Sequence, residues 1–163
     1  MTFIEDQFAI HACLLKFCRG LDRFDRDLFL SAFTEDAMIS VGDLSKSAAD
    51  MYDWASDLHR EGQISTQHTL SNHFCRVEDD LAFSEVYYQF IGRNRDDSNW
   101  IAGGRYIDRL ARVGDEWRIV ARRNVVEWNG SLPSSPLPFG DSVDPKVVGA
   151  RDLTDPSYTF DLS

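Results

Sequence analysis

The segment from Thr66 to about residue 128 constrains the fold most, because its hydrophobic pattern keeps a period of two throughout. Short turns rich in Asp, Gly and Ser divide it into four strands, at about 67–78, 81–94, 99–112 and 116–128. Consecutive long strands joined by such turns pair as an antiparallel meander. Gly103 and Gly104 lie inside the third strand, where a bulge would bend the sheet. We therefore expect a long, curved antiparallel sheet.

Three helices are predicted before this sheet. Residues 3–20 have apolar side chains near 3.6-residue spacing, with Thr2 as N-cap, Glu5 completing a capping box and Gly20 as the stop. Asp25 caps a second predicted helix over 26–33. A first short strand, 37–41, ends at Gly42-Asp43, and a third helix follows from about Ser47 to Arg60. One apolar face of this third helix consists of Met51, Trp54, Ala55 and Leu58.

This element order predicts an α+β fold of one domain. Three N-terminal helices would pack on a curved, mainly antiparallel sheet, giving a cone that encloses a pocket. At 163 residues and 43% hydrophobic composition, the chain can fill one core, over residues 1–130. All five prolines lie between 133 and 156, so residues 131–163 are expected to be an extension that packs on the same domain. Its candidate anchors, over the pocket mouth or against a second subunit, are Phe139, Tyr158 and Phe160.

Charge and motifs exclude several functional classes. The net charge of −10 would repel a nucleic acid or an anionic membrane surface, so we expect neither as a partner. There is no N-terminal targeting pattern and no apolar run near the roughly 20 residues of a membrane span, so a cytoplasmic protein is expected. The three cysteines lack CxxC spacing, which indicates no disulfide and no metal site. Nucleotide-binding, serine-hydrolase and zinc-protease motifs are also missing.

Asp22 and His68 are the candidate catalytic pair. Asp22 follows the first helix and His68 begins a long strand, so both could lie at one opening of the cone. A carboxylate facing the Nδ1–H of His68 would fix its tautomer and leave Nε2 free to take a proton from a substrate. The alternative is that Asp22 only caps or solvates a loop, and that His68 is an ordinary half-buried strand histidine.

Arg122 is the candidate electrostatic partner. In an unbulged strand it faces away from Trp117 and shares a face with Asn124. If that face lines the cavity, its cation could stabilise developing negative charge or a leaving group. In a bulged strand Arg123 would take this place. The alternative role is a salt bridge with one of three carboxylates, those of Asp22, Asp108 and Glu127.

Apolar side chains from the helices and the second long strand could wall a pocket for a small cyclic or aromatic molecule. The predicted lining residues are Phe17, Trp54, Leu58, Asn72, Tyr88 and Phe90. Core packing explains most of them equally well. His73 lies on the opposite strand face from His68 unless a bulge intervenes, and we assign it to structure or an interface. His11 and His59 are expected to be solvated helix positions.

Five segments together resemble the SnoaL-like branch of the nuclear-transport-factor-2-like superfamily. They are residues 15–25, 33–37, 68–72, 102–109 and 117–123, and the resemblance covers about residues 3–128. It implies a cone-shaped α+β fold. The chain is similar to scytalone dehydratase and hexachlorocyclohexane dehydrochlorinase, which abstract a proton with an aspartate-oriented histidine and need no cofactor. Carried onto this sequence, these roles fall on Asp22, His68 and Arg122.

The leading hypothesis is a cofactor-independent lyase or isomerase that acts on a small apolar cyclic compound. The competing hypothesis is a non-catalytic binding or accessory protein, such as the small subunit of an aromatic-ring hydroxylating dioxygenase, which the same superfamily includes. Because the outer face of such a sheet commonly forms an interface, we expect a homodimer or homotrimer.

Overall fold

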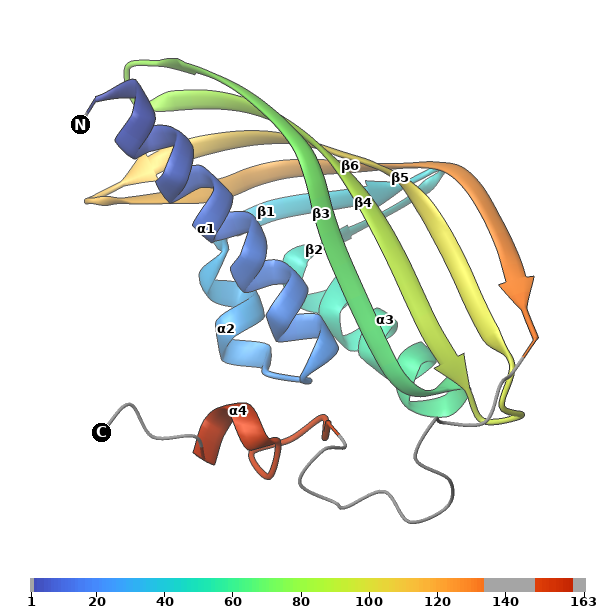
Figure 1. The fold of residues 1–163 in the computed structure, drawn as a ribbon. Helices are drawn as coiled ribbons and strands as arrows, with labels where there is room; N and C mark the ends of the chain where they lie inside the picture. Colours follow the sequence, from blue (N-terminus) through green and yellow to red (C-terminus); the bar gives the residue numbers. More distant parts are fainter. Residues whose placement is uncertain (1, 134–148, 160–163) are drawn as a thin grey trace.

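The computed structural model describes residues 2–133 and 149–159 and has an α+β architecture (Figure 1). In chain order the elements are α1 Phe3–Asp22, α2 Arg26–Ser31, β1 Phe33–Val41, β2 Leu44–Ser47, α3 Ala48–Gly62, β3 Gln63–Glu78, β4 Leu81–Asn94, β5 Asn99–Val113, β6 Glu116–Leu132 and α4 Pro156–Thr159. None of the helices in these ranges has the length and apolarity that crossing a membrane would require.

One six-stranded sheet has the order β2-β1-β6-β5-β4-β3. The four strands from β3 to β6 form the predicted antiparallel meander, whereas β1 runs parallel to β6 and pairs on its other side with β2. The sheet is strongly curved, and α1, α2 and α3 lie on its concave side (Figure 1). The cone-shaped fold expected from the sequence is confirmed.

Several register shifts interrupt the strand pairing, and three bulges among them change which side chains face the concave side near the site. The extra residues are Asn72 in β3, Val120 in β6 and Glu127 in β6, the last opposite Gly103-Gly104 as predicted. A Cβ atom on Gly104 would lie 1.9 Å from the carbonyl oxygen of Val125, so only glycine fits there.

The α1 helix begins at the predicted capping box, formed by Thr2 and Glu5. It ends at Asp22, beyond the predicted stop at Gly20. Gly20 instead allows α2 to approach, since a Cβ atom there would lie 2.5 Å from the backbone nitrogen of Phe29. Asp25 then caps α2 by accepting a hydrogen bond from the backbone N–H of Leu28, as expected.

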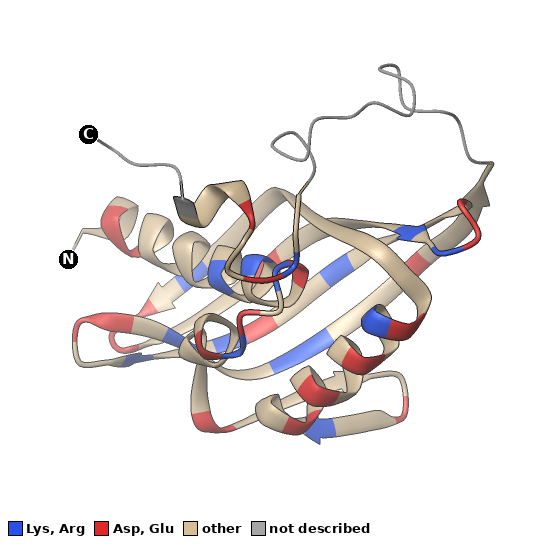
Figure 2. Ribbon diagram, turned by 90° about the horizontal axis from the view of Figure 1, so that it is seen from below, with Lys and Arg blue, Asp and Glu red and all other residues tan. Residues whose placement is uncertain are grey.

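The turn at Gly42-Asp43 does not end the sheet, because it connects β1 to the short strand β2. Gly42 has φ +57°, which a glycine adopts without strain. Ser47 is the N-cap of α3, and acidic residues lie along the exposed face of this helix (Figure 2). Its opposite face, which includes buried Met51 and Tyr52, packs toward the sheet.

The described part of the C-terminal extension contacts the ends of α1 and α3. Asp155 forms an ion pair with Arg23 at 3.5 Å, and the Tyr158 hydroxyl donates to Asp25. Arg151 donates to the backbone carbonyl of His59. The other two predicted anchors, Phe139 and Phe160, lie outside the described residues.

Candidate active site

Asp22 and His68 meet at the C-terminal end of α1. Asp22 Oδ1 lies 2.7 Å from His68 Nδ1, and Asp22 Oδ2 accepts a hydrogen bond of 2.7 Å from the backbone N–H of His68. The Asp22 and His68 side chains are only 11% and 6% exposed, respectively. Because α1 continues past Gly20 to Asp22, the Asp22 side chain reaches the first half of β3. The two residues that the sequence predicts as a pair are therefore in contact.

This double contact fixes the tautomer of His68. A carboxylate only accepts hydrogen bonds, so Nδ1 must carry the proton, and the neutral ring presents an unprotonated Nε2. Burial of the Asp22 carboxyl group works to raise its pKa, but the hydrogen bonds from His68 and the positive charge of its ring when protonated outweigh burial. The pKa of Asp22 therefore lies below its usual value, and the group is ionised at neutral pH.

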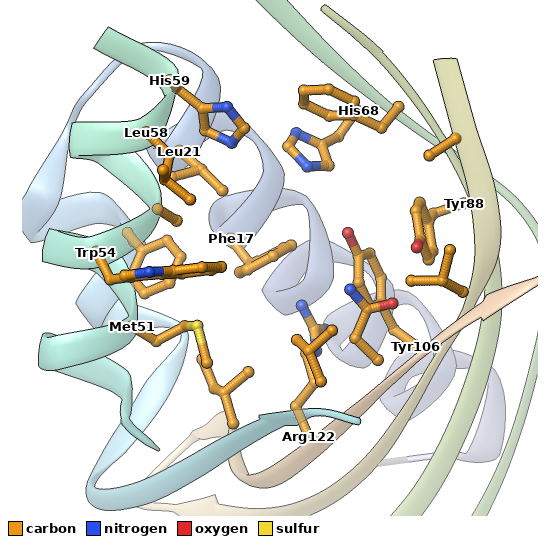
Figure 3. Close-up of a pocket in the computed structure, with 18 of the residues that line it drawn as sticks. Phe17, Leu21, Met51, Trp54, Leu58, His59, His68, Tyr88, Tyr106 and Arg122 are labelled. Carbon is orange, nitrogen blue, oxygen red and sulfur yellow. The ribbon is translucent and has the colours of Figure 1, made fainter. Parts of the chain in front are cut away.

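A cavity of about 290 Å³ lies between the helices and the sheet, and His68 is in its wall (Figure 3). Most lining side chains are apolar, and four of the predicted pocket residues, Phe17, Trp54, Tyr88 and Phe90, are among them. Leu58 also lines it, although 48% of this residue is exposed. This volume is at the lower end for small-molecule sites and suits a molecule of one or two rings.

Asn72 does not line this cavity, contrary to expectation. It is the exposed extra residue of the β3 bulge, with φ +44°. The same bulge turns His73 to the concave face, where its Nε2 lies 3.0 Å from Ser84 Oγ and its ring lies 5.2 Å from that of His11. His11 is half-buried in this contact, so the prediction of a solvated position was wrong.

Arg122 lines the cavity, and it also forms a salt bridge with Asp108, one of the three carboxylates predicted as its partners. Its Nε and Nη2 atoms each donate to Asp108 at 2.7 Å, while its guanidinium carbon lies 4.1 Å from the ring centroid of Phe17. Nη1 is buried without a hydrogen-bond partner in the described part of the chain.

The orientation of Arg122 depends on the Val120 bulge. Trp117 and Arg122 are both 2% exposed and lie on the concave face, although an unbulged strand would turn them to opposite faces. The expectation that a bulge would turn Arg123 inward was wrong. It assumed that Trp117 faces outward, but Trp117 itself lies on the concave face. Arg123 is exposed.

Three polar side chains of the cavity were not among the predicted site residues: His59, Tyr106 and Asn124. His59 stacks on Phe90 with 5.2 Å between ring centroids, so its prediction as a solvated position was wrong. A sequence signal existed, because His59 follows Ala55 by four residues and Met51 by eight, on the apolar helix face. The Tyr106 ring stacks on Tyr88 at 4.3 Å.

The protein is thus a cone-shaped α+β domain in which an aspartate–histidine pair lies at the wall of an apolar cavity. The chain belongs to the SnoaL-like domain family of the nuclear-transport-factor-2-like superfamily, whose family profile matches residues 2–123. No curated protein matches the chain by sequence.

Solved structures of similar fold include three relevant relatives. A type 2 hexachlorocyclohexane dehydrochlorinase, LinA, superposes with a TM-score of 0.73 at 16% identity, over 83% of this chain and 95% of that chain. A proposed scytalone dehydratase from Novosphingobium aromaticivorans gives 0.71 at 18% identity, over 81% and 91%. A proposed aromatic ring hydroxylase from the same organism gives 0.71 at 22% identity, over 81% and 96%. At these identities the likeness establishes the fold.

Proposed function

We propose that the protein is a cofactor-independent lyase or isomerase that acts on a small, largely apolar cyclic compound. The observation that carries this proposal is the buried Asp22–His68 contact at the wall of an apolar cavity. Two of the structural relatives are named as a dehydrochlorinase and a proposed dehydratase, which agrees with elimination chemistry.

His68 is the general base in this proposal. Its Nε2 takes a proton from a carbon of the bound ring, and the electron pair of that C–H bond forms a carbon–carbon double bond. In an elimination, the group on the neighbouring carbon leaves with its bonding pair, as halide, or as water when a hydroxyl takes the proton now on Nε2. In an isomerisation, an existing carbon–carbon double bond of the ring breaks, and its electron pair forms the new C–H bond as the proton returns from Nε2 to a different carbon. Asp22 holds the single proton of the neutral ring on Nδ1, which leaves Nε2 as the acceptor, and it stabilises the imidazolium that the step forms.

Arg122 is the electrostatic group. Its unpartnered Nη1 can donate to the leaving group or to an oxygen that gains charge. The rings of Phe17 and Tyr106 contact the guanidinium and restrict its position. Asp108 neutralises the resting charge of Arg122, which lowers the cost of burying it beside an apolar ligand.

The test is a turnover screen of halogenated and hydroxylated cyclic compounds, with products followed by mass spectrometry and with D₂O as solvent to detect proton exchange. We expect turnover by the wild type that survives EDTA treatment, and a loss of about 10³-fold or more in His68→Gln and Asp22→Asn. Asp57→Asn, the same change at an exposed carboxylate of α3, should keep full activity. Full activity of Asp22→Asn would refute the dyad.

The non-catalytic alternative has a separate signature. A small subunit of an aromatic-ring hydroxylase would copurify stoichiometrically with a large oxygenase subunit and would turn over none of these compounds. That result would replace the enzyme proposal.

A further inference from the structure

A second imidazole, His59, lies on the α3 side of the cavity, while His68 lies on the β3 side (Figure 3). The proton transfer described above does not use it. We propose that His59 determines substrate specificity by accepting, through Nε2, a hydrogen bond from a hydroxyl group of the bound ring compound. This inference rests on the proposed function, because it narrows the substrate class of the same cavity to hydroxylated rings.

The proton on His59 is fixed by a hydrogen-bond chain that starts at the surface with Asp96. The Asp96 carboxylate accepts from the Ser98 hydroxyl at 2.6 Å and from the Ser98 backbone N–H at 3.0 Å. These hydrogen bonds lower the pKa of Asp96, so it is ionised at neutral pH and only accepts. Since the single hydroxyl proton of Ser98 points to Asp96, Ser98 Oγ can only accept from its next neighbour.

That neighbour is Asn94, whose Nδ2 lies 2.9 Å from Ser98 Oγ and must be the donor. Asn94 therefore presents its Oδ1 to Gln63, which donates from Nε2 at 3.2 Å. Gln63 then presents its Oε1 to His59 Nδ1, 2.9 Å away. Because an amide oxygen accepts, Nδ1 of His59 carries the proton, and Nε2 is a free acceptor.

The electrostatic surroundings keep this acceptor available. Burial lowers the pKa of His59, and the nearby His68 lowers it further, against the opposing hydrogen bond to Gln63. The ring is thus neutral at pH 7. The Phe90 ring stacked on its face, with 22° between the planes, restricts its rotation.

Two arginines hold the end of α3 that carries His59. Arg95, in the turn between β4 and β5, donates to the backbone carbonyls of Arg60 and Glu61. Arg151, in the C-terminal segment, donates to the carbonyls of His59 and Gln63. The bonds from Arg95 satisfy carbonyls that a helix end leaves unpaired, and Arg151 adds a second donor to the His59 carbonyl, so His59 lies on a fixed backbone.

The chemistry of the ligand follows from this arrangement. In this arrangement His59 and His68 both have an unprotonated Nε2. His68 takes a proton from carbon, whereas His59 only binds the ligand. A purely apolar ring would remove water from His59 Nε2 and leave this acceptor unpaired. A ring hydroxyl supplies the missing donor.

The first experiment measures the tautomer of His59 by long-range ¹H–¹⁵N NMR in the ligand-free protein. We expect Nδ1–H in the wild type and in Gln63→Glu, whose carboxylate keeps an acceptor for Nδ1–H. Gln63→Leu removes the acceptor and should allow Nε2–H, which free histidine favours in water. An Nε2–H tautomer in the wild type would overturn the inference without bearing on the Asp22–His68 pair.

The second experiment uses quenching of tryptophan fluorescence to measure the Kd values of 2-naphthol and 2-methylnaphthalene. These two ligands differ only in that the first carries a hydroxyl group where the second carries a methyl group. The ratio of the two Kd values reports the preference for the hydroxyl and cancels changes common to both ligands. His59→Phe, which retains a ring for Phe90, should reduce this preference about five- to tenfold. Asp57→Asn, at an exposed carboxylate of α3 outside the cavity, should leave it unchanged within twofold.

The outcomes separate the two proposals. An unchanged ratio in His59→Phe, or an equal fall in Asp57→Asn, would mean that the hydroxyl does not bind His59 and would overturn the role of His59. A reduced ratio in His59→Phe supports that role even if the turnover screen finds no Asp22-dependent reaction.

Discussion

At the residue scale, the two carboxylate oxygens of Asp22 serve two different donors on one residue. One accepts from the ring of His68 and the other from its backbone N–H. An asparagine has a single acceptor oxygen, so one of these contacts must be lost in Asp22→Asn. The backbone N–H cannot change its proton, and we expect the amide oxygen to turn to it, with the amide N–H₂ facing a deprotonated Nδ1.

The lowered pKa of Asp22 predicts a pH-dependent contribution to stability. A carboxyl group with a lower pKa in the folded than in the unfolded state stabilises the fold above its unfolded value of about 3.9, and this stabilisation disappears as the pH falls through the folded value. Urea unfolding should show Asp22→Asn to be about 1–2 kcal/mol less stable than the wild type at pH 7. The difference should shrink below about pH 4. A difference that is the same at pH 7 and pH 3, or one that Asp57→Asn reproduces, would contradict this.

The buried Arg122–Asp108 pair predicts a strongly coupled double-mutant cycle. Arg122→Leu leaves the Asp108 carboxylate buried without its cation and should cost about 3–5 kcal/mol in the free energy of unfolding. Adding Asp108→Leu removes the unpaired charge and should restore most of this loss. Denaturant unfolding of the four proteins measures the coupling, and additive losses would show that the pair is not the source of the cost.

The sequence predicts the position of some site residues and misses that of others. The dyad is predictable, because Asp22 and His68 lie in segments that resemble a known family, and the structure brings them into contact. His59 is missed because a polar residue at the end of an amphipathic helix was assigned to the solvent side. Its burial depends on Phe90 of a strand far along the chain, which helical periodicity does not describe.

At the element scale, the bulges show which local features leave a trace in the sequence. The bulge opposite Gly103-Gly104 is predictable from the glycines. The bulges at Asn72 and Val120 have no such signal, and each exchanges the faces of the residues that follow. The error at Asn72 comes from counting faces across an unseen bulge, whereas the error at Arg123 comes from the inward position of Trp117.

Two helical glycines provide a matched test of the contact between α1 and α2. Gly20→Ala places a Cβ atom 2.5 Å from the backbone of Phe29 and should destabilise the protein by about 2 kcal/mol or more, since backbone must move. Gly62→Ala has no atom within 4 Å of the new Cβ and should be neutral or stabilising by about 0.5 kcal/mol. Thermal and urea unfolding measure both. Equal effects would mean that helix propensity, and not the close approach, decides the outcome.

At the scale of the whole molecule, the meander of long strands and the helices that cover it are predictable from periodicity and turns. The parallel pairing of β1 with β6 is not, because it joins segments about 80 residues apart in sequence and depends on how the sheet closes against the helices. The short strand β2 is missed for a related reason, since Gly42-Asp43 is equally compatible with a strand end and a hairpin.

Large apolar side chains on the outer face of β3 and β4 support the expected oligomer. Phe74, Tyr87 and Ile91 are 56%, 41% and 42% exposed there. Light scattering should give a mass of two or three times 18.6 kDa, and Phe74→Glu should reduce it toward the monomer. Leu153→Glu, an equally drastic change at a residue that is 76% exposed outside this face, should leave the mass unchanged. A wild-type monomer at micromolar concentration would contradict the prediction.

The proposal that Asp22 holds His68 as a general base is tested most directly by the tautomer of His68. Long-range ¹H–¹⁵N NMR measures this tautomer in the wild type and in Asp22→Asn at neutral pH. We expect a protonated Nδ1 and an unprotonated Nε2 in the wild type, and the reverse in Asp22→Asn. Nε2–H in the wild type, or the same tautomer in both proteins, would mean that Asp22 does not hold His68 as a base, and the proposed chemistry would be wrong.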